Sequence, residues 1–243
     1  MFKLIPKHLR KFPHVKPHNW LNHELIVRFL EEMGRKYATG TLVDIGCGKK
    51  PYKEVFAPFV EQHIGVDLVD AIHGNEEVDI VGSAYETGLE AGSCDVILCS
   101  EVLEHLEEPE IALKELNRIL TKGGRGIFTV PFFWPVHEAP RDFYRYTEYG
   151  LRHLFEKAAF DEIDVVPLTG FWPMAIQMLI YATRRLKGLF LLRHLVGLGH
   201  YWLQKLAMFT NRYDKRFQFT NLYGVVATKY RSCDEPAKEG LVS

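Results

Sequence analysis

Residues 41–52 read T-L-V-D-I-G-C-G-K-K-P-Y, and this stretch decides the expected fold. Its first half, L-V-D-I, is a short apolar run interrupted only by Asp44, which is typical of a buried parallel strand. Gly46 and Gly48 follow at once. Glycines at the carboxyl end of a strand allow a tight turn and let a ligand approach the bare backbone. The stretch therefore predicts a turn built to hold a ligand.

The side chain of Asp44 narrows the kind of ligand. A carboxylate beside a glycine turn suits a ligand that carries an ammonium group or hydroxyls, and it suits a pyrophosphate poorly. A dinucleotide-binding turn also needs a third glycine, and Pro51 occupies that position here. Two glycines alone are weak evidence, so a turn without any ligand is the alternative at this point.

The composition is that of an ordinary globular chain. Its 243 residues are 47% hydrophobic and 25% charged, enough for one large domain with its own core. The formal net charge of −1 predicts no bulk affinity for nucleic acid. The four cysteines form no C-x-x-C pair, which favours reduced, buried thiols. Without a signal-peptide core or a long apolar run, a cytoplasmic protein that does not span a membrane is expected.

Alternating apolar segments predict an α/β fold with a doubly wound, mostly parallel sheet. Strands are expected at residues 41–45, 63–67, 78–82, 94–99, 126–130, 163–168 and 222–230. Helices are expected at residues 20–37 and 52–57, from Pro109 to the glycines at 123 and 124, and at residues 147–158 with Thr147 as N-cap. The predicted divisions are a basic N-terminal arm and helix at residues 1–39, one domain at 40–230 with a helical insertion at 170–218, and a disordered tail at 231–243. Within the arm, residues 1–19 contain three prolines and are expected to be loosely held.

Four segments occur in a recognisable order: V-D-I-G-C-G, G-V-D-L, C-D-V-I-L-C-S-E-V-L-E-H-L and L-N-R-I-L-T-K-G-G-R-G-I-F-T-V-P. Across residues 41–168 this order resembles the type-11 branch of the class I S-adenosylmethionine (SAM) dependent methyltransferases. The resemblance implies a Rossmann-like sheet of seven strands whose last strand is antiparallel, with helices on both faces. It also implies SAM as cofactor and S-adenosylhomocysteine as product.

The same resemblance assigns cofactor-binding residues. Asp44 would lie near the methionine ammonium, Asp67 would accept the ribose hydroxyls, and Leu68 would pack on the adenine. The remaining residues assigned to the cofactor are Gly46, Cys47 and Gly48 in the turn, Ser83 and Ala84 where the family often has an acid that recognises adenine, and Ser100 and Glu101 beneath the methionine part. Serine at position 83 departs from the family, so adenine recognition would rest more on backbone and packing.

The loop at residues 131–147 is rich in aromatic and charged side chains, and it follows the strand at the edge where the acceptor is expected. His137 is the predicted general base for a hydroxyl acceptor, oriented by Glu138 or Asp142. The alternative is a hydrogen-bonded lid without proton transfer.

Further residues near this loop have predicted roles other than proton transfer. Trp134, Arg141, Tyr144 and Arg145 are predicted to contact the acceptor. No metal is predicted at His137 and Glu138, because the spacing offers no third ligand. The neighbouring pair of residues 104 and 105 is given a structural role.

Two segments carry only basic charges. Residues 1–20 contain five Lys/Arg and residues 165–213 contain six, and neither contains an acidic residue. Basic residues among the apolar helical faces of the insertion suit an element peripheral to the inner membrane face. A cap on the acceptor pocket or a homodimer face are the alternatives.

The predicted activity is SAM-dependent methyl transfer to a hydroxyl of a glycan or lipid-linked intermediate. This choice follows a looser similarity to bacterial methyltransferases associated with surface glycans. The alternatives are a methyltransferase of a small aromatic or quinone-like metabolite and a SAM-binding protein without turnover.

Overall fold

A computed structural model of the chain describes residues 4–12, 15–69, 74, 76–184, 193–214 and 218–230. The predicted disordered tail at residues 231–243 lies outside the described residues, as do residues 185–192 and 215–217 of the predicted insertion.

The described helices and strands are, in order, η2 (Lys7–Lys11), α1 (Trp20–Tyr37), β1 (Thr41–Ile45), α2 (Lys53–Phe56), β2 (Gln62–Asp67), β3 (Ile80–Val81), β4 (Cys94–Ser100), η3 (Leu103–His105), α3 (Pro109–Ile119), β5 (Leu120–Pro131), α4 (Glu148–Lys157), β6 (Asp161–Pro167), α5 (Phe171–Thr183), α6 (Arg193–Asn211) and β7 (Leu222–Thr228).

The strands form one seven-stranded sheet in the order β3-β2-β1-β4-β5-β7-β6. Strands β1 to β5 pair in parallel, whereas β7 is antiparallel to both β5 and β6. The predicted Rossmann-like methyltransferase sheet with an antiparallel last strand is therefore confirmed. The parallel strands β1, β2, β4 and β5 end along one edge, where ligands bind in open α/β sheets.

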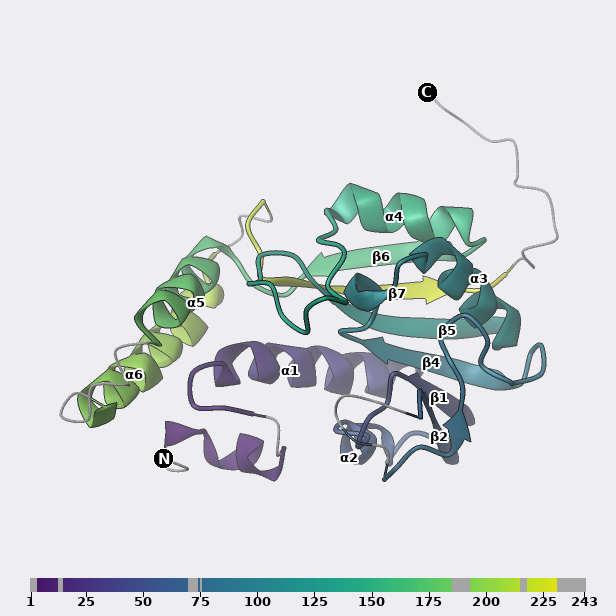
Figure 1. Cartoon of the computed structure of the whole chain (residues 1–243), viewed down its shortest axis with the longest axis horizontal. Helices are drawn as coiled ribbons and strands as arrows, with labels where there is room; N and C mark the ends of the chain where they lie inside the picture. The colour runs from purple at the N-terminus through teal and green to yellow at the C-terminus, as the bar shows by residue number, and fades with distance from the viewer. Residues whose placement is uncertain are drawn as a thin grey trace.

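Helices cover both faces of the sheet, with α1 and α2 on one side and α3 and α4 on the other (Figure 1). The side chains of β1 alternate between these layers, because successive residues of a strand point to opposite faces. Leu42 belongs to the hydrophobic cluster that includes residues of α1, whereas Val43 and Ile45 belong to the cluster that includes residues of α3 and α4. The near-continuous apolar run in β1 thus serves two cores at once.

Helix α3 ends earlier than the sequence predicts. It stops at Ile119, and Leu120 already pairs with Cys94 as the first residue of β5. Gly123 and Gly124 therefore lie inside β5 and do not cap the helix. Pairing with β4 and β7 outweighs the local C-cap signal, since Gly123 at φ +86° donates its N–H to the carbonyl of Lys229.

The N-terminal arm packs against the domain and is not loosely held over its described residues. Ile5, Leu9, Phe12 and Val15 are buried in the same cluster as α1. Their spacing of three and four residues places them on one side of η2 and the segment after it. The prolines of the arm predicted a loosely held segment, although its apolar residues keep this spacing.

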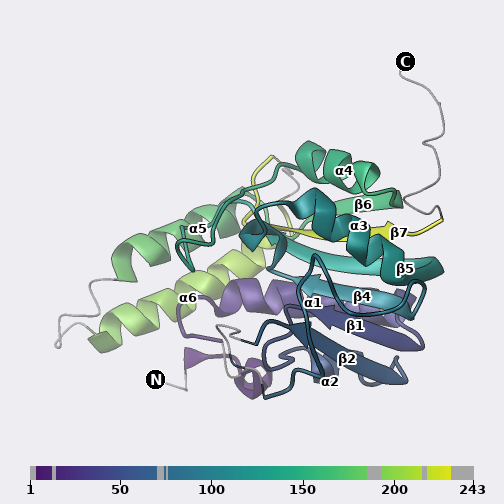
Figure 2. The same ribbon diagram turned by 45° about the vertical axis from the view of Figure 1, so that its right-hand side comes forward.

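The predicted insertion contains α5 and α6, which run side by side and project from the edge of the sheet (Figure 2). Buried side-chain amides join α6 to the arm: Gln204 donates to the carbonyl of Pro17 and accepts from the N–H of Leu21. No described helix is long and apolar enough to cross a bilayer.

Candidate active site

The glycine turn follows β1 and is held to β2. The N–H of Gly46 donates to the carbonyl of Val66 at 2.9 Å, and Gly46 has φ +66°. A Cβ atom at this position would lie 2.6 Å from Cγ2 of Val102. Only glycine fits this position, because both the backbone angle and the space exclude a side chain.

Asp44 lies beneath the turn with a partner that the sequence did not predict. Its carboxylate is buried and lies 3.1 Å from Nε2 of His63 on β2. Burial raises the pKa of Asp44, while the bond to His63 and its charge oppose that rise. A cationic group of a ligand would stabilise the ionised carboxylate further, which fits the position expected for the methionine ammonium.

Asp67 ends β2 opposite the turn. Its Oδ2 accepts from the N–H of Gly48 at 2.7 Å, and its Oδ1 accepts from the N–H of Leu68 at 2.7 Å. These two bonds fix the orientation of the carboxylate while leaving each oxygen a further lone pair. The geometry fits a carboxylate that accepts two neighbouring hydroxyls.

The other predicted cofactor residues differ in their exposure to solvent. Leu68 is partly exposed beside Asp67, as a residue that packs on a ring would be. Ser83 Oγ accepts from the N–H groups of two following residues, and Ala84 is buried in the hydrophobic core. The thiol of Cys47 is buried, which raises its pKa to about 12, so this residue offers a ligand its backbone only.

A buried lysine, absent from the predicted site, braces the turn. Lys50 has φ +45° and forms a short contact with the carboxylate of Asp79, and its ammonium also donates to the carbonyl of His63 at 3.0 Å. Asp79 in turn accepts from the N–H of Gly65 at 2.7 Å. This lysine joins the turn to β2 and to the residue before β3. The sequence signal was an acid within the predicted third strand and a lysine directly after the glycines.

Glu101 follows β4 and has φ +56°, which turns its side chain out of the strand. Its N–H donates to the carbonyl of Thr129, while the neighbouring Ser100 hydroxyl bonds to the Thr129 hydroxyl at 2.7 Å. Burial raises the pKa of Glu101 to about 7, although a bond to Thr129 and the charge of Arg145 act against the rise. Its Oε1 is buried and has no hydrogen-bond partner among the described residues.

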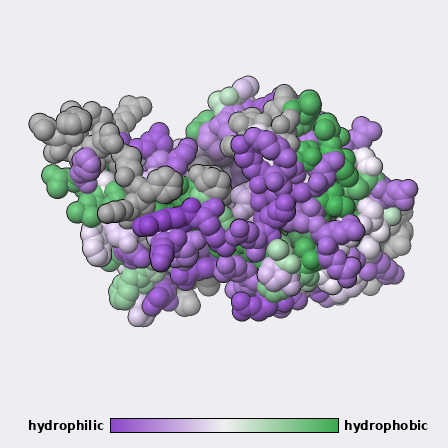
Figure 3. Space-filling model, turned by 90° about the horizontal axis from the view of Figure 1, so that it is seen from below, coloured by the Kyte–Doolittle hydropathy of each residue, from purple (hydrophilic) through white to green (hydrophobic). Residues whose placement is uncertain are grey.

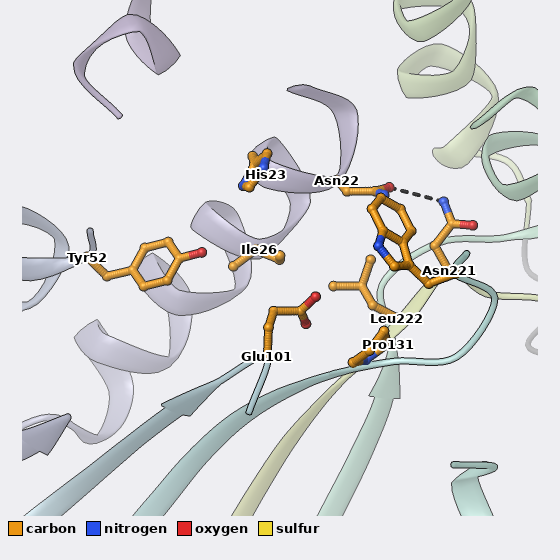
Figure 4. A pocket seen from close by; sticks show the side chains of 9 residues that line it. Asn22, His23, Ile26, Tyr52, Glu101, Pro131, Asn221 and Leu222 are labelled. Carbon is orange, nitrogen blue, oxygen red and sulfur yellow. Dashed lines mark hydrogen bonds between the residues drawn. The ribbon is translucent and has the colours of Figure 1, made fainter. Parts of the chain in front are cut away.

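The carboxyl group of Glu101 faces a narrow cavity of about 60 Å³ (Figure 4). The cavity lies between the start of α1, the end of β5 and the start of β7, and its lining residues are Asn22, His23, Ile26, Tyr52, Glu101, Pro131, Trp134, Asn221 and Leu222. Trp134 was predicted to contact the acceptor, whereas Asn22, Tyr52 and Asn221 were not predicted. Nothing in the local motifs identifies these three, since residues far apart in the sequence meet only in the fold.

Burial raises the pKa of Tyr52, so its phenol stays protonated and can donate a hydrogen bond. At the other end of the cavity, Asn221 donates to the side-chain oxygen of Asn22 at 3.0 Å (Figure 4). The cavity thus combines apolar and aromatic walls with a few polar groups, as small-molecule sites usually do.

Next to Glu101, the structure brings together Glu104, His105 and His137. One ligand atom of each residue lies within 4.8 Å of the others. His105 Nε2 is 3.6 Å and His137 Nε2 is 3.8 Å from Oε1 of Glu104, and the two imidazole rings meet edge to face at 4.8 Å. The spacing along the sequence offered no third ligand near His137 and Glu138, whereas η3 places two potential ligands, Glu104 and His105, beside His137.

Glu104 is completely buried, and neither of its carboxylate oxygens has a hydrogen-bond partner among the described residues. Burial raises its pKa well above the usual value, and the nearby Glu101 adds to the rise. Burial and the neighbouring His105 lower the pKa of His137, which favours its neutral, metal-binding form. Two imidazoles and an unsatisfied carboxylate form a donor set that fits a divalent cation with mixed nitrogen and oxygen preference.

The predicted partners of His137 have other contacts. Asp142 accepts its backbone N–H at 2.9 Å, but both Asp142 oxygens are bound by the guanidinium of Arg145 at 2.6 and 2.7 Å. This pairing lowers the pKa of Asp142 to about 2. The carboxylate of Glu138 lies 3.6 Å from His105. Arg145 therefore braces the loop, while Oδ2 of Asp142 also lies 3.5 Å from Nδ1 of the His137 ring, within ion-pair distance.

The last two predicted acceptor residues lie on the outside of the loop. Tyr144 is partly exposed and donates its hydroxyl to the carbonyl of Glu107 at 2.8 Å. Arg141 is exposed, and its carbonyl is bound by the imidazole of His105. Trp134 packs edge-on against Tyr181 of α5, which places α5 beside the cavity.

Comparisons with known proteins agree with this geometry. Residues 43–128, from β1 into β5, match the family described as a methyltransferase domain. They include the glycine turn, Asp67 and Glu101. Residues 43–128 resemble a class I SAM-dependent methyltransferase domain, and the sheet around them has that fold. SAM is the cofactor of this class, and the positions of Asp44, the glycine turn and Asp67 suit the binding of SAM.

Curated relatives match part of the chain. A ubiquinone biosynthesis O-methyltransferase of Idiomarina loihiensis is 30% identical over 99 residues, covering 36% of this chain and 41% of that protein. The protein of the same description from Paraburkholderia xenovorans is 31% identical over 144 residues, covering 51% of this chain and 61% of the relative. The matches thus span less than two thirds of these relatives.

A solved structure shares the fold. Phosphoethanolamine N-methyltransferase 2 of Haemonchus contortus, in complex with S-adenosyl-L-methionine, superposes with a TM-score of 0.56 at 18% identity. The match covers 86% of this chain and 53% of that one.

Proposed function

We propose that this protein transfers the methyl group of SAM to an oxygen of a small aromatic or quinone-like acceptor that binds at the mouth of the Glu101 cavity and inserts its hydroxyl into it. The observation that carries the proposal is the buried Glu101 oxygen, which has no partner among the described residues and faces a cavity next to the glycine turn. A buried acceptor atom without a partner costs free energy, and a bound hydroxyl would satisfy it.

When bound, SAM supplies an electrophilic methyl group on a sulfonium. The protein must align the acceptor oxygen with that methyl, exclude water and take up the hydroxyl proton. Glu101 is better placed for the proton than His137, because Glu101 lines the cavity and His137 does not. With a pKa raised to about 7, Glu101 is a matched base near neutral pH. The rate should therefore rise as the pH increases through about 7, since only the ionised carboxylate accepts the proton.

Beside this base, the cluster of Glu104, His105 and His137 would hold a divalent cation. A cation there would attract the acceptor oxygen as a Lewis acid and lower the pKa of its hydroxyl. A cation would displace the proton of buried Glu104 and supply the counter-charge that its ionised form needs.

Two observations favour an aromatic acceptor. Tyr52 and Trp134 line the cavity, and aromatic side chains pack well against planar rings. The curated relatives are described as ubiquinone biosynthesis O-methyltransferases. A hydroxyl of a glycan or lipid-linked intermediate is the second candidate, and the exposed apolar hairpin beside Trp134 is the observation that favours it.

The test is methyl transfer from methyl-labelled SAM to a panel of acceptors. The panel holds a catechol, a hydroquinone with a short isoprenoid tail and a lipid-linked saccharide fraction. Each is tested after chelation of metal and after adding back Mg²⁺, Mn²⁺ or Zn²⁺. Glu101→Gln serves as the chemical variant, and Glu90→Gln, which changes an exposed acid that does not line the cavity, is its matched control.

We expect labelled methyl ether on the aromatic acceptors. Glu101→Gln should lower kcat at least a hundredfold, as loss of a general base does. Label confined to the saccharide fraction would refute the aromatic acceptor. Calorimetric SAM binding with no label in any fraction would favour a binding protein without turnover.

A further inference from the structure

One side of α6 carries a continuous apolar stripe that the other described residues leave exposed. Large side chains along this stripe are exposed, and they are Leu195, Leu198, Trp202, Leu206, Phe209 and, just past the helix end, Tyr213. The steps between them are three or four residues, so they lie on one side of the helix. Their exposed fractions run from 46% for Leu198 to 73% for Tyr213. An exposed stripe of this size marks an interaction surface.

The opposite side of α6 is firmly attached, so the stripe is not the product of a loosely placed helix. His200, Gln204 and Ala207 are buried, and His200 bonds to the hydroxyl of Thr183 on α5 at 2.9 Å. The amide of Gln204 bonds to the N-terminal arm. The hairpin therefore presents its apolar stripe in a fixed orientation.

Helix α5 extends the apolar surface of the hairpin. Trp172 and Leu179 are about half exposed and lie seven residues apart, two turns of the helix. Hydrophobic residues lie beside hydrophilic ones at the end of the molecule that the hairpin forms (Figure 3). Tryptophan and tyrosine, both present here, are the side chains that prefer the level of lipid headgroups.

The charges of α5 and α6 indicate which kind of partner the apolar stripe would bind. Residues 165–213 contain no Asp or Glu, whereas Arg184, Lys205 and Arg212 are exposed among the apolar side chains. Two such hairpins would repel each other, which disfavours a second copy of this chain. An anionic lipid surface takes up apolar side chains and attracts the cations around them.

We infer that the α5–α6 hairpin docks on the surface of an anionic lipid bilayer. Trp202 and Phe209 enter the headgroup region, and Lys205 and Arg212 pair with lipid phosphates. Because Trp134 of the cavity packs on Tyr181 of α5, docking holds the cavity close to the bilayer. An acceptor dissolved in the lipid could then reach it. This docking does not depend on the chemistry proposed for the cavity.

The test is flotation of the full chain with vesicles. Vesicles of phosphatidylcholine mixed with phosphatidylglycerol are compared with vesicles of phosphatidylcholine alone, at low and high salt. The apolar variant is Trp202→Ser with Phe209→Ser, and the charge variant is Lys205→Ala with Arg212→Ala. The matched control is Tyr149→Ser, which removes an aromatic side chain that is 81% exposed on α4.

We expect binding to the phosphatidylglycerol vesicles that weakens at high salt. The apolar variant should bind at least tenfold more weakly, and the charge variant about twenty-fivefold, at roughly fivefold per basic residue. Tyr149→Ser should bind as the unaltered chain does. Unchanged circular dichroism and SAM binding would show that the variants are folded.

Two outcomes would overturn the inference. One is the absence of binding to phosphatidylglycerol vesicles at low salt. The other is a dimer in light scattering that the apolar variant converts to a monomer, because the stripe would then be covered by a second copy of this chain.

Discussion

Replacing Glu104 by glutamine distinguishes between two roles of this residue, a metal ligand and a buried acid that binds no metal. In the chain without a cation, burial raises the pKa of Glu104 and favours its neutral form. Glutamine has nearly the same shape and is also neutral. The unfolding temperature of Glu104→Gln without metal should therefore stay within about 4 °C of the unaltered chain, the change expected for about 1 kcal/mol in a domain of this size.

A bound cation should act very differently on the two proteins. A cation present at a hundred times its dissociation constant stabilises the folded state by about 2.7 kcal/mol. In a chain of this length that corresponds to about 5–10 °C in unfolding temperature. Loss of the carboxylate should weaken binding about a hundredfold or more, which leaves at most about 1 °C of the shift at the same concentration.

The assay is thermal unfolding followed by circular dichroism, with chelator and with Mn²⁺ or Zn²⁺. The shift should increase with pH, because a cation displaces the proton of Glu104 and needs neutral imidazoles. Glu90→Gln, which changes an exposed acid, should keep the full shift. No metal-dependent shift in the unaltered chain, or an equal shift in Glu104→Gln, would refute the assignment of Glu104, His105 and His137 as ligands.

Three further predictions concern the cofactor edge and the acid stability of the domain. Asp67→Ala removes the carboxylate expected to accept two ribose hydroxyls and should weaken SAM binding about tenfold to a hundredfold in calorimetry; near-unchanged affinity would reject that role. Lys50→Met removes the buried lysine of an ion pair whose acid, Asp79, is half exposed, and should lower the free energy of unfolding by about 1–2 kcal/mol in urea, whereas Lys49→Met, which affects an exposed pair, should change it by less than about 0.5 kcal/mol; equal effects would contradict the reasoning. Hydrogen bonds from an arginine and a threonine lower the pKa of Glu115 to about 2, so their stabilisation is complete above its ordinary value of 4.5 and is lost as the pH falls from there to about 2. Because that arginine is partly exposed, about 2 kcal/mol should be lost in acid, and Glu115→Gln should abolish this part of the pH dependence; an unchanged profile would dismiss it.

The sequence by itself determined the class of fold and the cofactor edge. Strand β1, the glycine turn after it and the acid at the end of β2 are local patterns, because burial on both faces and a tight turn leave direct traces in the chain. The N-cap of α4 is equally local, and Thr147 Oγ1 accepts from Gly150 as predicted. The antiparallel last strand followed from the family resemblance and is confirmed.

Only the tertiary structure decided the chemistry next to that edge. Glu104 and His105 are more than thirty positions away from His137 in the sequence. They meet because β4 and β5 pair in parallel, so that the loops after both strands leave the sheet at the same edge. The buried partner of Asp44 is likewise on a neighbouring strand, and the cavity residues of α1 and β7 come from opposite ends of the chain. Spacing along the chain does not predict these contacts, since strand order and register, rather than sequence distance, determine which side chains touch.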